Sequence, residues 1–347
     1  MFSPRGIASI LVKAPSDVVI LSSLRTPICR ANRGSLKDAF PEELLASVLK
    51  ATIDGVPNLD PSIIEDVAVG VVLYELGGSK AARMAMNHVG YPNTTSLYTV
   101  NRACSSSLQA ISSTASQIRT GMISVGIGVG MESMTRNLGS PVIDALDCIL
   151  PMGITSENVA ERYGISREDQ DTFAVNSHLK AAEARAFGLF SDEIVPVTQK
   201  KPDGLGEVVV DTDDGIRPQA SSEGLAKLKP AFRENGTSTA AKELGLSGNI
   251  MGKFVSAVTV GCAPDEMGVG PVIAIPKLLD STGLTKDDVH RWEINEAFAS
   301  QAIYCLRKLD VERACQNNKF NPHGGAIALG HPLGATGARL TSTLLHG

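Results

Sequence analysis

The chain has 347 residues, of which 43% are hydrophobic and 20% are charged, an ordinary mixture for a globular protein. This length favours two domains or two similar halves over a single core. The formal net charge of −5 argues against a general basic surface for nucleic acid. No apolar stretch approaches the roughly 20 residues of a membrane span, and six scattered cysteines without a C-x-x-C pair disfavour a zinc site.

The N-terminal part is predicted to alternate strands and helices. Residues 1–15 match no clear targeting signal and are predicted to be a disordered terminus or the remnant of a targeting segment. A helix is expected over about 41–53, with Pro41 in its first turn and apolar residues along one face. A further helix is predicted over 106–119, a buried strand at 18–21, and further strands at 67–72, 96–100 and 125–130.

The region 138–235 differs in character and is predicted to be an inserted loop domain. Its helix, at about 167–186, should begin at a capping pair formed by Ser166 and Asp169. Short strands are predicted at 194–198 and 207–211.

The region 254–347 echoes the first. Residues 59–69 and residues 284–294 each read as a short acidic helix start followed by a strand, which indicates a weak internal duplication. Alternating strands and helices in both parts predict an α/β fold with two layered, similar halves.

Cys104 is a candidate nucleophile. It follows an apolar strand and stands directly before a predicted helix. The positive end of a helix and its free N–H groups lower the pKa of a thiol and favour the reactive thiolate. Most lone cysteines are inert and buried, however, so the position alone leaves both interpretations open.

His331 lies in a glycine-rich run, residues 321–338, that indicates close approach of the backbone to another group. A histidine there can take a proton from a thiol and later donate one. His323 shares the run, and local sequence does not choose between the two. The run matches neither G-x-G-x-x-G nor a Walker loop, which disfavours nucleotide binding through those motifs.

Asn295 begins the tetrapeptide Asn-Glu-Ala-Phe after a predicted strand at 291–294. Its side-chain amide could help to hold an oxyanion. On local grounds a helix cap formed by Asn295 is an equally good interpretation.

Five ordered segments carry a resemblance to thiolases, most of all to the peroxisomal 3-ketoacyl-CoA type, over nearly the whole chain from about residue 17. These segments are Val100–Ala110, Gly130–Thr135, Met152–Ala160, Asn295–Phe298 and Gly324–Gly337. The resemblance implies a layered αβαβα fold with two similar halves and an inserted loop domain. The first half would comprise 16–137 plus 138–235, and the second, incomplete, would comprise 236–347.

The resemblance also implies the roles of the site residues. Cys104 would accept the acyl group. His331 would activate it and, with Asn295 through a water, would hold the thioester oxyanion. Met152 would lie near the acyl or pantetheine pocket, and Phe298 near the catalytic centre. The implied reaction cleaves 3-ketoacyl-CoA with CoA in fatty-acid β-oxidation, with coenzyme A as a substrate and no cofactor or metal.

Three features depart from the family pattern. Thiolases carry a second catalytic cysteine in a C-x-G motif, which no cysteine of residues 1–347 has, and Gly347 follows His331 by 16 residues. After Ala240, roughly twenty residues that supply a CoA-contacting loop seem to be deleted, about one strand and one helix. Ser107 stands where the family has glycine. We therefore expect poor stability or a rearranged C-terminal half, because lost strands leave backbone groups unpaired.

Two alternatives to an active thiolase stay open at this point. One is a catalytically impaired chain of the same fold, from splicing or truncation, including a non-catalytic role beside an intact subunit. The other is a different cysteine-dependent condensing enzyme, which the combination of Asn295 with Gly330-His-Pro disfavours. The resemblance implies a homodimer and a peroxisomal location, although no targeting signal is clear and a mitochondrial or cytosolic location is not excluded.

Overall fold

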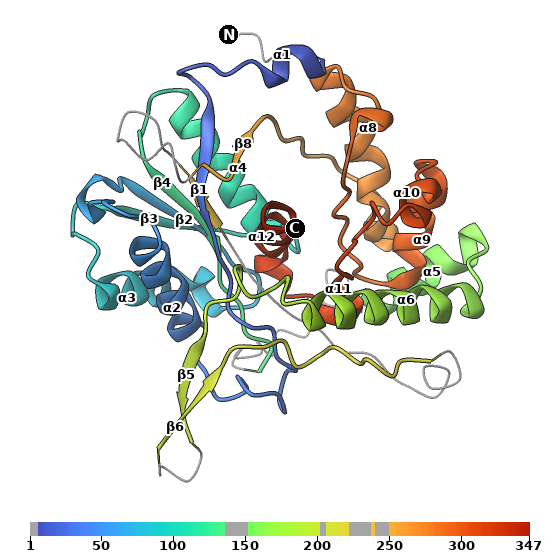
Figure 1. Cartoon of the computed structure of the whole chain (residues 1–347), viewed down its shortest axis with the longest axis horizontal. Coiled ribbons are helices and arrows are strands. Elements are labelled where there is room, and N and C mark those ends of the chain that lie inside the picture. Colours follow the sequence, from blue (N-terminus) through green and yellow to red (C-terminus); the bar gives the residue numbers. More distant parts are fainter. Residues whose placement is uncertain (1–5, 136–151, 202–205, 222–236, 240–249) are drawn as a thin grey trace.

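The computed structural model describes residues 6–135, 152–201, 206–221, 237–239 and 250–347 (Figure 1). Its main sheet has six strands in the order β3-β2-β4-β7-β1-β8. Strand β2 is parallel to β3 and β4, whereas β7 is antiparallel to both β4 and β1. The strands are β1 Val18–Ser23, β2 Asp66–Gly70, β3 Ser96–Val100, β4 Gly126–Gly130, β7 Thr237–Thr239 and β8 Gly252–Phe254.

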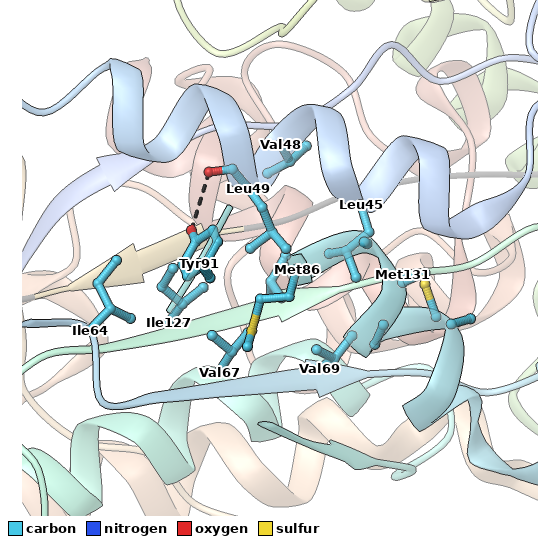
Figure 2. Close-up of a cluster of buried hydrophobic side chains, with 14 of the residues drawn as sticks. Leu45, Val48, Leu49, Ile64, Val67, Val69, Met86, Tyr91, Ile127 and Met131 are labelled. Carbon is cyan, nitrogen blue, oxygen red and sulfur yellow. Dashed lines mark hydrogen bonds between the residues drawn. The ribbon is translucent and has the colours of Figure 1, made fainter. Parts of the chain in front are cut away.

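One face of this sheet carries branched side chains and packs under α2 (Pro41–Asp54) and α3 (Ser79–Val89). Figure 2 shows Val67 and Val69 of β2 beneath Leu49 and Met86 of these helices. Tyr91 closes the cluster by donating its hydroxyl to the carbonyl of Leu49 at 3.2 Å. The alternation of large and small residues along β2 and β4 thus directs the core to one face.

The other face of the sheet carries small residues and receives α4 (Ser106–Arg119) and α12 (Thr336–His346), which lie beside each other in Figure 1. A Cβ atom on Gly130 of β4 would stand 2.5 Å from the Cα atom of Ala335. One on Gly337 of α12 would stand 2.5 Å from the Cβ atom of Leu108 in α4. These glycines are needed because backbone meets backbone at the junction of β4, α4 and α12.

The inserted region begins with α5 (Met152–Tyr163) and α6 (Arg167–Ala186). Ser166 and Asp169 form the predicted capping box at the start of α6. Two strands, β5 (Val197–Lys200) and β6 (Glu207–Val210), form a separate antiparallel pair. They lie within three residues of the predicted positions. The rest of the predicted insertion, including 136–151 and 222–236, lies outside the described residues.

The C-terminal part contains helices joined by extended segments. The helices are η5 Pro264–Val269, α8 Gly270–Thr282, η6 Lys286–Asp288, α9 Ala299–Lys308, α10 Glu312–Gln316, α11 Ala326–Leu329, η7 Leu333–Ala335 and α12. The strand predicted at 291–294 is wrong as a regular element, since the segment forms one isolated bridge, between Trp292 and Phe320. The site of the inferred deletion, 240–249, lies outside the described residues.

A side chain completes the pairing that the backbone leaves unfinished beside this bridge. The amide of Asn321 accepts a hydrogen bond from the N–H of Ile294 at 3.0 Å and donates to the carbonyl of Ile294 at 2.9 Å. Asn321 has a φ of 38°, in the left-handed region that asparagine tolerates better than most residues. The side chain of Asn321 therefore makes the two hydrogen bonds with Ile294 that the backbone of a neighbouring strand would otherwise make.

The N-terminal segment differs from the predicted disordered terminus where it is described. Ile7–Leu11 forms the short helix α1, and the N–H of Gly6 donates to the carbonyl of Thr282 at 2.6 Å. Residues 1–5 lie outside the described residues. In the described part of the chain, no helix combines the length and the apolar character needed to cross a membrane.

Candidate active site

Cys104 stands in a strained turn between β3 and α4. Ala103, directly before it, has a φ of 45°, which is unfavourable for a residue with a Cβ atom. The hydroxyl of Ser106 holds this turn by accepting from the N–H of Arg102 at 2.8 Å and donating to the carbonyl of Ala103 at 2.6 Å. Backbone strain maintained by surrounding bonds is common at functional sites.

The predicted lowering of the Cys104 pKa is wrong for this structure. Burial raises the pKa of the Cys104 thiol to about 11, and the carboxylate of Glu132 raises it further against a lowering by a backbone hydrogen bond. Desolvation of the thiolate therefore outweighs the helix N-terminus. At neutral pH the resting thiol is protonated, so nucleophilic attack requires a base.

His331 is buried, with 3% of its surface exposed, between α11 and η7. Its Nδ1 atom lies 2.7 Å from the hydroxyl oxygen of Thr336, the first residue of α12. If the Nδ1–H donates to Thr336, Nε2 is the basic nitrogen. Leu333, two residues later, has a φ of 34°, so strained backbone follows His331 as it precedes Cys104.

Asn295 contacts the imidazole of His331 directly. Its side-chain nitrogen lies 3.3 Å from both Nδ1 and Nε2. A group at these equal distances in the ring plane would collide with Cε1, so the amide lies over the face of the ring. The Oδ1 atom of Asn295 is buried and has no hydrogen-bond partner among the described residues. This pair was predicted from sequence, but its stacked geometry was not.

Hydrogen bonds join the helix that follows Cys104, and the loops after β2 and β4, to the run that holds His331. The hydroxyl of Ser107 accepts from the N–H of Ala338 at 3.0 Å. The carboxylate of Glu132 accepts from the N–H of Gly334 at 3.1 Å. It also accepts from the N–H groups of Val72 and Leu73, each at 3.0 Å. The two candidate residues therefore belong to one packed region.

Two buried glutamates in the recognised motifs were missed as site-building residues. Glu132 is described above. Glu296, beside Asn295, accepts from Ser177 at 2.6 Å, from Asn321 at 2.9 Å and from the N–H of Ile327 at 3.2 Å. The sequence offered one indication of them, an acidic residue inside a motif of mostly apolar or small residues. Such an acid can be buried when several hydrogen-bond donors surround its carboxylate.

The choice between the two histidines follows from their surroundings. The ring of His323 packs edge-on against Phe190, with 6.1 Å between centroids. Burial and the nearby charge of Arg291 lower the pKa of His323 to about 4, which keeps it neutral. Asn295 and Thr336 contact His331 and not His323 among the interactions of the described residues. His331 is therefore the candidate base.

Met152 and Phe298 lie at the starts of two helices, α5 and α9, that pack against each other. Met152 is half-buried at the start of α5, and Phe298 is the N-cap residue of α9. The two helices are joined by a 2.7 Å hydrogen bond between the hydroxyls of Ser156 and Ser300. Contact of either residue with an acyl or pantetheine group stays a prediction. No group of three or more potential metal ligands gathers in the part of the chain that is described.

Comparison with known proteins supports this assembly of motifs. The N-terminal domain model of thiolases matches residues 18–247, and the C-terminal domain model matches residues 248–347. The chain is 48% identical to peroxisomal 3-ketoacyl-CoA thiolase 1 of Arabidopsis thaliana, over 95% of this chain and 81% of that protein.

Solved structures give the same result. The dimeric peroxisomal thiolase of Saccharomyces cerevisiae superposes with a TM-score of 0.86 at 39% identity, covering 98% of this chain and 93% of that one. A second structure of the 3-ketoacyl-CoA thiolase from the same yeast, described as five α-β-α-β-α layers built from two core domains of identical topology, superposes with a TM-score of 0.81 at 40% identity, covering 97% and 92%. The chain has this layered fold, and it belongs to the thiolase family.

Proposed function

We propose that the chain is an acyltransferase that cleaves 3-ketoacyl-CoA with CoA, releasing acetyl-CoA and an acyl-CoA shortened by two carbons. The observation that carries this proposal is the contact of His331 with Asn295 and Thr336, in a run that is hydrogen-bonded to α4, the helix that follows Cys104. The names of the thiolase relatives support the same reaction.

In the first half of the proposed reaction, Nε2 of His331 takes the proton of the Cys104 thiol. The pKa of about 11 makes this transfer necessary, since few thiolates exist at neutral pH. The sulfur then attacks the 3-keto carbon of the substrate. The Nδ1 contact with Thr336 fixes the orientation of the ring and leaves Nε2 as the nitrogen that can take the proton.

The oxyanion that forms at the attacked carbonyl needs hydrogen-bond donors. The protonated imidazole of His331 and the side-chain amide of Asn295 are the available pair, because they contact each other at 3.3 Å. Cleavage of the C2–C3 bond leaves the acyl group on Cys104, and acetyl-CoA departs as an enolate that must gain a proton. In the second half CoA takes the acyl group from the sulfur.

Substrate, compartment and assembly are proposed on weaker support. Coenzyme A enters as a substrate, and the chemistry described requires no further cofactor or metal. The relatives are named peroxisomal, which supports a peroxisomal location. The yeast structure is named dimeric, which supports a homodimer.

A second candidate is acylation of Cys104 without turnover. It is favoured by the site itself, since the contacts of His331 with Asn295 support the first half-reaction, and no described residue is assigned to protonate the departing enolate or to activate CoA. In this case the first half-reaction proceeds as proposed above and the second does not.

The test is to incubate the chain with acetoacetyl-CoA, with and without CoA, and to follow both consumption of the substrate and the mass of the Cys104 peptide. We expect an acetyl group on Cys104, none in Cys104→Ala, and acylation about 10²-fold slower or more in His331→Ala. Cys262→Ala, at another partly buried cysteine, is the matched control and should react like the wild type. Turnover with CoA supports thiolysis. Acylation alone supports the second candidate, and an unmodified wild-type Cys104 overturns both.

A further inference from the structure

The first turn of α12 lacks a capping residue of its own. Its N-cap position is Ala335, which has no side-chain acceptor. The first four N–H groups of a helix need partners from outside it, and a hydroxyl usually bonds the second or third of them. In this chain the hydroxyl comes from another helix. Ser107 of α4 accepts from the N–H of Ala338, the third residue of α12, at 3.0 Å.

This bond joins the two turns that hold the candidate catalytic groups. Ser107 lies three residues after Cys104, in the first turn of α4. Ala338 lies two residues after Thr336, whose hydroxyl contacts His331. Neither Ser107 nor Ala338 has any exposed surface, so water cannot readily replace either partner.

The packing around this hydroxyl is close. The Cβ atom of Ser107 would lie 2.8 Å from a Cβ atom on Gly130. A Cβ atom on Gly337 would meet Leu108, the neighbour of Ser107. The Ser107 side chain therefore occupies the point at which β4, α4 and α12 meet, and its oxygen is the polar link across that point.

We propose that Ser107 is a positioning residue for acyl transfer to Cys104. Its hydroxyl holds α4 against α12 so that the thiol at the start of one helix meets the imidazole held by the other. The inference rests on the proposed role of Cys104 as the acyl acceptor.

The test compares Ser107→Ala with Ser342→Ala. Ser342 is the matched control because it also lies on α12, is also fully buried, and uses its hydroxyl to bond the carbonyl of Ser23 at 3.0 Å. It ties α12 to β1 and not to α4. Thermal unfolding by circular dichroism gives the folded fraction of each variant. Acylation by acetoacetyl-CoA is then measured across substrate concentrations, at a temperature at which all variants are folded.

We expect both variants to have lowered melting temperatures. Only Ser107→Ala should show a maximal acylation rate that is about tenfold lower, with unchanged half-saturation by acetoacetyl-CoA, since misalignment affects the chemical step. Equal acylation rates in the two variants would overturn the positioning role and leave the proposed function intact. A wild-type chain that is not acylated would overturn both. If Ser107→Ala does not fold, Ser107→Gly takes its place, and a wild-type acylation rate in that variant overturns the inference.

Discussion

Two segments of similar sequence have different structures in the two halves of the molecule. Residues 59–70 form a short 3₁₀ helix, η1 (Pro61–Ile63), and then β2, which pairs along its whole length with β3 and β4. Residues 284–294 form the 3₁₀ helix η6 and then an extended segment with one bridge. The local pattern is repeated, but the strand requires neighbours on both sides, which the described part of the second half does not supply.

Two buried arginines differ in whether their guanidinium groups have hydrogen-bond partners. Arg25, beside β1, donates to Glu193 at 2.7 Å and to both carboxylate oxygens of Asp213 at 2.7 and 2.8 Å. Arg339, on α12, is equally buried, but its three nitrogens have no hydrogen-bond partner among the described residues. Its nearest carboxylate, that of Glu293, is 4.0 Å away. The two arginines are equally buried, but only Arg25 has hydrogen bonds to carboxylates that offset the burial of its charge.

The largest effect is expected from removing the satisfied arginine. Arg25→Met leaves two buried carboxylates without their cation and should lower the free energy of unfolding by about 3–5 kcal/mol. Arg339→Met should cost much less, since burial already raises the pKa of Glu293 to about 8 and its carboxyl can stay protonated at neutral pH. Urea denaturation at pH 7 measures both. Equal losses of the free energy of unfolding would contradict the proposed difference between Arg25 and Arg339.

A smaller loss of stability is expected from removing the Asn321 side chain, which makes hydrogen bonds with the backbone of Ile294 in place of a neighbouring strand. Asn321→Gly keeps the left-handed backbone allowed but removes the bonds to Ile294 and Glu296, and it should cost about 2–3 kcal/mol. Asn318→Gly is the control, because Asn318 also has a positive φ, 52°, but an exposed side chain. It should change stability by less than about 0.5 kcal/mol. A similar loss in both variants would mean that the hydrogen bonds between Asn321 and Ile294 contribute little to the free energy of unfolding.

The smallest effect concerns pH. The pKa of Glu293 is raised by burial, against the nearby charges of Arg339 and Arg291 and together with those of Glu193 and Glu296. A raised carboxyl pKa means that the folded state holds a proton that the unfolded state has lost, so stability falls as pH rises toward 8. Between pH 6.5 and 8 the free energy of unfolding should fall by about 1–2 kcal/mol in the wild type.

Glu293→Gln should remove this dependence, and Glu312→Gln, at an exposed carboxyl, should keep it. The buried His178 and His323, whose pKa values are lowered to about 4, affect stability mainly below pH 6.5 and do not disturb this window. A wild-type stability that stays level or rises between pH 6.5 and 8 would contradict the prediction.

Sequence patterns predicted the first half well because its signals are local. Pro41 and the apolar stripe after it placed α2 to within a residue, and the Ser166–Asp169 pair located the start of α6. The five motifs identified the family and selected Cys104, His331 and Asn295. Whether the chain is poorly stable stays a prediction.

What the sequence could not give depends on contacts between distant segments. The direction of the Cys104 pKa shift depends on burial, which no local pattern reports. The prediction of a strand at 291–294 was wrong because a strand needs partners from distant segments, and this segment forms only the bridge between Trp292 and Phe320. Thr336 and Ser107 acquire their roles only when α12 packs on α4, and β7, with three residues, is too short to leave a periodic signal.

The glycine contacts between β4, α4 and α12 have a consequence for how the molecule can change. Gly130 and Gly337 bring the backbones so close together that only small side-chain atoms, such as those of Ser107 and Ala335, fit between them. A junction of this kind transmits a displacement of one helix to the other without absorbing it. Altered preference for different acyl groups should therefore arise from changes in surrounding loops and helix ends, while the junction itself remains closed to larger residues.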